Sequence, residues 1–101
     1  MATSMIQASD FSVGDFTTIS EFPWTAPCDA VIEGRVYPAT SATSYMTFNI
    51  SDGRIFSLTA YGGTALSGMT IVKKGAVLSD YQSGNLATGA SYLGYIPLKK
   101  S

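Results

Sequence analysis

The sequence contains no histidine and only one cysteine, Cys28. Histidine is the commonest general base and metal ligand, and a Ser-His-Asp triad cannot form without it. One cysteine without histidine also falls short of the ligand sets of ordinary zinc sites. The glycines do not form a phosphate-binding motif between a strand and a helix. We therefore expect no metal, no cofactor and no enzymatic activity, and we interpret Cys28 as a small apolar side chain in a strand.

Charged side chains are also scarce. The 101 residues include six basic and seven acidic ones, which is 13% of the chain and a net charge of −1. We expect no nucleic-acid partner, because binding phosphates requires a run of basic residues. Charged residues usually make up about 25% of a soluble domain. This shortage predicts that part of the apolar surface is buried between copies of the chain.

The few carboxylates do not suggest a catalytic pair. Asp29 and Glu33 share one side of a predicted strand with Arg35. Glycosidases need two carboxyl groups that flank a scissile bond, whereas this pattern is typical of charges on a solvated strand face. Asp52 lies in a predicted hairpin turn, where aspartate is favoured for backbone reasons.

No segment approaches the roughly 20 apolar residues that a membrane-spanning helix requires. The first five residues lack the basic start and the apolar run of a signal peptide. The sequence therefore predicts neither membrane insertion nor an export signal.

What the sequence does contain is a succession of short alternating segments. Residues 29–37 alternate in a period of two, as do residues 45–50 and 55–60 on either side of Asp52-Gly53. The Asp-Gly pair suits the two-residue turn of a hairpin. Further strands are predicted over residues 16–22, 69–72, 76–78 and 91–98, with polar loops over residues 38–43 and 82–89.

About eight short strands with no convincing helix predict an all-β fold, either a β-sandwich or a barrel. Residues 1–15 show turn-like pairs and little periodicity, so we expect a lead-in segment that contacts a neighbouring subunit. Residues 16–101 are predicted to form the β-sandwich domain.

Tyrosine is the strongest indication of function. Its side chain combines flat apolar area with a hydroxyl group, as recognition surfaces and sugar sites require. The same residue is also common in half-covered strands. All six tyrosines fall at or beside predicted loops: Tyr37, Tyr45, Tyr61, Tyr81, Tyr92 and Tyr95.

Four segments, in the right order, resemble the small jelly-roll heads of bacteriophage tail fibres and receptor-binding proteins. They are an opening Thr-Ala-Pro segment, an Asp-Gly hairpin, a Lys-Lys-Gly turn and a closing Pro-Leu-Lys strand, at residues 22–34, 50–53, 71–76 and 95–99. Ala30 and Ala76 depart from the pattern, which prefers Gly and Asp at these positions. The resemblance implies a jelly-roll β-sandwich that assembles as a homotrimer in a virion.

The function implied by this resemblance is attachment to a glycan or protein on the host cell surface. The candidate receptor-binding residues are Tyr61, Tyr81, Gln82 and Asn85. The candidates for the buried face around the three-fold axis are Met46, Phe48, Tyr92 and Tyr95.

Two other functions stay open. The short chain also suits a capsid decoration or cement protein, or another structural virion protein, with residues 1–15 as a clamp. The third class is a carbohydrate-binding module. In each case the expected partners are other virion proteins or a surface glycan.

Overall fold

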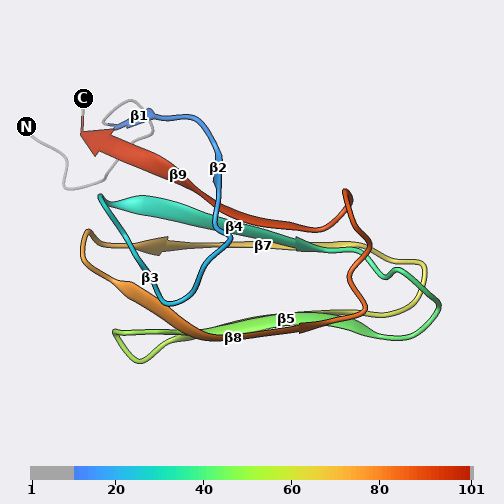
Figure 1. Ribbon diagram of the computed structural model, residues 1–101. Coiled ribbons are helices and arrows are strands. Elements are labelled where there is room, and N and C mark those ends of the chain that lie inside the picture. Colours follow the sequence, from blue (N-terminus) through green and yellow to red (C-terminus); the bar gives the residue numbers. More distant parts are fainter. Residues whose placement is uncertain (1–10, 101) are drawn as a thin grey trace, which may run out of the picture.

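The computed structural model describes residues 11–100, which form strands, turns and loops without a helix. Nine strands in this range build two antiparallel sheets that face each other (Figure 1). The first sheet contains β1 (Phe11–Val13), β2 (Thr17–Thr18), β4 (Ala30–Val36), β7 (Leu66–Val72) and β9 (Tyr92–Lys100). The second contains β3 (Trp24–Thr25), β5 (Ser44–Ile50), β6 (Ile55–Ala60) and β8 (Val77–Gly84). The predicted all-β class and a β-sandwich-like arrangement are confirmed.

The strand order is β1-β9-β4-β7 in the first sheet, with β2 also paired to β9, and β3-β8-β5-β6 in the second. The strands β6 and β7 are therefore edge strands of different sheets on the same side of the sandwich. On the opposite side the edges are formed by β1, β2 and β3, which have only two or three residues each.

Along β4, β5 and β6, successive side chains point alternately into and out of the sandwich, and this determines which of them fill the space between the sheets. Every second residue of these strands is buried, because one face of each sheet packs on the other sheet. Gly34 of β4 lies opposite Gly68 of β7 in the register. A Cβ atom at Gly68 would lie 2.7 Å from Leu58, so the two glycines allow the side chains of β6 to approach the first sheet.

Met46 and Phe48 lie in the centre of this core, each only 1% exposed. The ring of Phe48 stacks on that of Phe56, with 4.8 Å between the centroids. The prediction that Met46 and Phe48 line a subunit interface is therefore wrong. The opposite sheet of the same chain already covers both side chains.

Three predicted boundaries differ from the structure. The strand predicted over residues 16–22 is reduced to β2, because the chain leaves the first sheet after Thr18 and enters the second only at β3. The strand predicted over residues 69–72 starts earlier, at Leu66, because backbone pairing with β4 continues through Gly68. The loop predicted from Gln82 starts later, because β8 pairs with β5 as far as Gly84.

The predicted lead-in falls partly outside the described residues, since its first ten residues are not among them. Its next three residues form β1 and pair with the end of β9. The Gly14 amide donates to the Pro97 carbonyl at 2.9 Å, so this part of the segment follows the edge of the first sheet. The boundary between residues 15 and 16 stays a prediction.

Arg54 connects the two sheets across the side where β6 and β7 are the edges. Its guanidinium donates to the Thr70 hydroxyl at 2.8 Å and to the Ile71 carbonyl at 2.7 Å, both on β7. It also donates to the Asp52 carboxylate at 2.8 Å. The side-chain hydrogen bond from Arg54 is the main cause that holds the pKa of Asp52 below its ordinary value of 3.8.

The lowered pKa of Asp52 predicts a loss of stability in acid. A carboxyl group with a depressed folded-state pKa stabilises the fold above its unfolded pKa, and this contribution is lost as the pH falls through the folded value. We expect the urea midpoint of the wild type to fall more steeply below about pH 4 than that of Asp52→Asn. Parallel pH profiles for the two proteins would contradict this assignment.

The placement of Phe48 predicts a large loss of stability when its side chain is truncated. We expect Phe48→Ala to lower the free energy of unfolding by about 3–5 kcal/mol, because it leaves a cavity between the sheets. The control is Ile55→Ala, whose side chain is 68% exposed and for which we expect roughly 0.5 kcal/mol or less. Urea unfolding measures both, and equal losses would refute the core assignment.

Candidate functional site

Three loops gather at one end of the sandwich, opposite the end where β1 starts and β9 finishes (Figure 1). They comprise residues 37–43, 61–65 and 85–91. The first two loops touch, because the backbone of Gly62 lies so close to that of Ser41 that a Cβ atom would have no room. The first and third are joined by the Ala87 amide, which donates to the Tyr37 carbonyl at 2.8 Å. We refer to this surface as the loop end.

Asn85 holds the loop end together. Its backbone has a φ of 55°, a conformation that asparagine tolerates better than most residues. Its side-chain amide donates to the Ala42 carbonyl at 2.8 Å and accepts from the Thr40 hydroxyl at 3.1 Å. Since these bonds occupy the amide within the chain, Asn85 is placed to position the loop of residues 37–43. A direct receptor contact by Asn85 stays a prediction.

The other predicted receptor-binding residues lie in different surroundings. Tyr81 is half-buried, and its ring stacks on Phe22 with 4.7 Å between the centroids. Gln82 is exposed on the outer face of β8, where it lies opposite Thr47 of β5. Tyr81 and Gln82 are consecutive residues of β8, and the structure directs their side chains to opposite faces of the sheet.

Tyr61 is the most exposed large apolar side chain among the described residues, at 71%. It lies in the loop between β6 and β7. Two further tyrosines near this end, Tyr37 and Tyr45, are also exposed. The ring of Tyr45 covers Gly84 on the neighbouring strand, where a Cβ atom would lie 2.6 Å from a ring carbon. Neither is among the site residues predicted from the sequence. The position of Tyr45 opposite Gly84 follows from the register of β5 and β8, which the sequence alone does not give.

A shallow hollow of about 260 Å³ lies beside the third loop. Its lining includes Tyr81, Leu86, Thr88 and Tyr92. Pockets that enclose small molecules usually measure about 300–1,000 Å³. The hollow is therefore suited to the edge of a larger ligand rather than to the enclosure of a small one.

The three loops contain no charged residue. They present backbone groups, the hydroxyls of serine and threonine, and the exposed rings of Tyr37 and Tyr61. Such groups bind neutral ligands through hydrogen bonds and through contact with an aromatic face.

Of the predicted interface tyrosines, Tyr95 faces the core and Tyr92 faces outward. The ring of Tyr95 packs against Trp24 at a centroid distance of 4.9 Å. On the outer face of the first sheet, the Tyr92 hydroxyl donates to the Glu33 carboxylate at 2.9 Å, and Phe16 meets the Tyr92 ring edge to face. This hydrogen bond, followed by burial, raises the pKa of Tyr92 above its ordinary value of 10.0.

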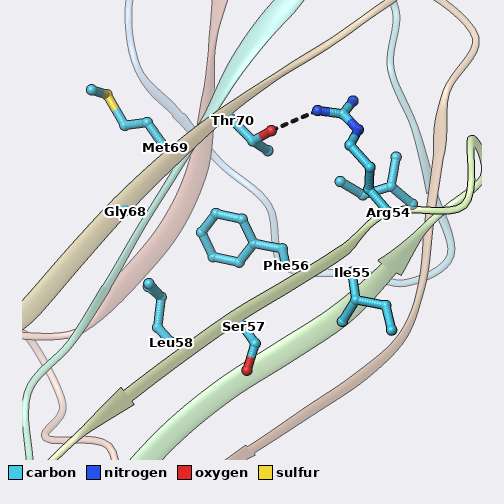
Figure 2. Close-up of a pocket in the computed structure, with 9 residues that line it drawn as sticks. Arg54, Ile55, Phe56, Ser57, Leu58, Gly68, Met69 and Thr70 are labelled. Carbon is cyan, nitrogen blue, oxygen red and sulfur yellow. Dashed lines mark hydrogen bonds between the residues drawn. The ribbon is translucent and has the colours of Figure 1, made fainter.

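A second concave surface of about 410 Å³ lies between the edge strands β6 and β7. Figure 2 shows the side chains of Phe56 and Leu58 at its base and the hydrogen bond between Arg54 and Thr70 at one end. This groove opens directly on the apolar core, to which Phe56 and Leu58 belong.

No group of three histidine, cysteine, aspartate or glutamate side chains within residues 11–100 is placed to hold a metal ion. The same residues contain no helix with the length and the apolar character needed to cross a membrane.

The raised pKa of Tyr92 predicts a distinct alkaline titration. Because the folded-state pKa lies above the unfolded one, this group stabilises the fold below about pH 10, and the contribution is lost as the pH rises through the folded value. We expect tyrosinate absorbance to show a phenol that ionises above the ordinary range in the wild type. Tyr92→Phe should remove this component and Tyr61→Phe should keep it. The assignment fails if Tyr92→Phe titrates like the wild type.

Comparison of the chain with protein-family models, curated proteins and solved structures finds no match.

Proposed function

We propose that the chain is an attachment protein of a bacteriophage virion, the tip or receptor-binding head of a tail fibre, which binds a host cell-surface glycan or protein through its loop end. The observation that carries this proposal is the placement of the three uncharged loops opposite the described chain ends. A head of this kind needs one end for attachment to the virion and the other for the host.

The strand order supports the jelly-roll part of the resemblance. β1 and β2 both pair with β9 and act as one interrupted edge strand. With these two counted together, each sheet has four strands, and the chain fills the two sheets in the manner of two Greek keys. The tail-fibre part of the proposal rests on the four resembling segments.

A glycan is the ligand that the chemistry of the loop end favours. Sugars offer hydroxyl groups for hydrogen bonds and apolar C–H faces for stacking on an aromatic ring. Tyr61 supplies an accessible ring, and the three loops also expose the hydroxyls of Ser41, Thr43, Thr64 and Thr88. A strongly anionic ligand is disfavoured, because no cation lies in these loops.

Assembly from several copies is part of the proposal. A shallow site binds weakly by itself, but linked copies that engage several receptors at once increase the overall affinity. The resemblance implies three copies, and the scarcity of charge is the sequence feature that supports burial between them.

The proposal predicts that Tyr61→Ala weakens glycan binding. The probe is an array of bacterial surface polysaccharides exposed to the labelled full chain. We expect the apparent affinity for the bound polysaccharide to fall about tenfold, which corresponds to about 1.4 kcal/mol for a lost stacking contact.

Two variants serve as controls for this experiment. Tyr61→Phe retains the ring and should bind nearly as the wild type does. Lys74→Ala changes an exposed residue in the turn between β7 and β8, away from the loop end, and should have no effect. Unchanged binding by Tyr61→Ala would refute the site. Binding to purified capsids, with a gain in their heat resistance and no glycan binding, would replace the proposal with a decoration protein.

A further inference from the structure

A single stretch of the sequence without charge forms both edge strands on the open side of the sandwich, and Arg54 crosses this side at one end. Residues 55–72 comprise β6, β7 and the loop between them, and they include no lysine, arginine, aspartate or glutamate. Arg54 and Lys73 stand immediately outside this segment. Natural proteins usually protect an exposed sheet edge with charged residues, proline, bulges or very short strands. The short strands β1, β2 and β3 meet this rule on the other side, but the seven-residue strand β7 does not.

Exposed apolar side chains concentrate on the same segment. Met69 and Ile71 of β7 are 69% and 60% exposed. Figure 2 shows Met69 turned away from the groove, whereas Phe56 lies within it. Eight large hydrophobic residues are exposed in the described part of the chain, and five of them belong to residues 55–72: Ile55, Tyr61, Leu66, Met69 and Ile71.

The backbone of β7 has hydrogen-bonding groups directed at this open side. Arg54 reaches the Ile71 carbonyl from outside the first sheet, so this carbonyl points away from β4. Backbone groups alternate in direction along a strand, and those of Met69 and Ser67 therefore point the same way. A carbonyl oxygen can accept two hydrogen bonds. Arg54 uses one acceptor position of the Ile71 carbonyl, and the other remains for a second donor.

We propose that this edge binds a second copy of the same chain, with β7 pairing antiparallel to β7 of that copy across a two-fold axis at Met69. The first sheets of both copies then form one continuous sheet. In this register Met69 lies opposite its own counterpart, and Ser67 lies opposite Ile71 of the second copy. All three residues direct backbone groups to the open edge, as such pairing requires.

Charge favours a copy of the chain as the occupant. In a two-fold pairing, β7 of one copy lies against β7 of the other. A charged residue near the axis would therefore lie close to the same charge in the second copy and repel it. Residues 55–72 have none, and Arg54, whose guanidinium reaches the Ile71 carbonyl, is paired with the Asp52 carboxylate at 2.8 Å. Lys73 of one copy would lie opposite Ala65 of the other, eight residues from the second Lys73. At about 3.3 Å per residue this separates the two cations by roughly 26 Å, well beyond the screening length of about 8 Å at physiological salt.

The inference concerns assembly and does not depend on the ligand of the loop end. It predicts pairs of chains where the resemblance implies a three-fold assembly. The mass of the assembly therefore tests it separately from glycan binding.

The first experiment is sedimentation of the full chain over a range of concentrations. We expect the wild type to reach twice the 10.6 kDa of one chain and Met69→Lys to remain at the mass of one chain. Gln82→Lys introduces the same charge at an exposed position on the central strand β8 and should leave the pairing unchanged. Because Met69 is largely exposed, Met69→Lys should keep the wild-type unfolding transition of the single chain.

The second experiment tests the register by disulfide formation in a Cys28→Ser background. Residues that face each other as a hydrogen-bonded pair have Cα atoms about 5.5 Å apart, within the range that a disulfide spans. Met69→Cys should therefore cross-link two chains on oxidation. Ser67→Cys should not, because its counterpart lies four residues away along the strand, at roughly 13 Å.

Each remaining outcome would overturn the proposal. A wild type that stays a single chain at every concentration would show that no second copy occupies the edge. Three times the mass of one chain would favour the three-fold assembly instead. Pairing that survives Met69→Lys, or that cross-links through Ser67→Cys and not Met69→Cys, would place the contact elsewhere.

Discussion

Every backbone N–H and C=O group in a sheet needs a hydrogen-bond partner, and the two sides of this sandwich meet that need differently. On one side the edges are short strands that leave little backbone unpaired. On the other side β6 and β7 run for six and seven residues with no charged side chain between Ile55 and Val72. The Arg54 side chain satisfies one carbonyl of β7 and holds the sheets together, but the rest of this edge faces outward. The account of assembly depends on this asymmetry.

The same strand order separates the proposed receptor site from the proposed pairing edge. The connections between strands put three loops at one end, where long-range hydrogen bonds such as those of Asn85 fix their positions. The described chain ends lie at the other end, and the uncharged edge runs between the two. A chain of this kind can contact a receptor at its loop end while its edge contacts a copy of itself. A chain this short, with 13% charged residues and a small core of its own, would gain stability from the proposed contact with a copy.

Local alternation made the all-β class and the central strands predictable. In β4, β5 and β6 the period of two follows from packing one face on the other sheet, so the sequence alone identifies the apolar face. It does not identify what covers that face. For this reason Phe48 and Met46 were predicted at a subunit boundary, although the opposite sheet of the same chain covers them.

The features that the sequence could not predict depend on contacts between distant residues. The stacking of Tyr81 on Phe22 and the hydrogen bonds of Asn85 join segments about 40–60 residues apart. The early end of β2 within residues 16–22 reflects a crossing between sheets, which leaves no local periodicity. The uncharged segment 55–72 was visible in the composition, but only the strand order shows that it forms both edges of one side.

Amide hydrogen exchange of β7 tests the central claim most directly, because it reports on the edge backbone itself. If a second copy pairs with this strand, the amides of Ser67 and Met69 exchange slowly at high protein concentration and faster on dilution. If their exchange is as fast as that of the exposed Gly63 amide at every concentration, the edge is open to water and the account is contradicted.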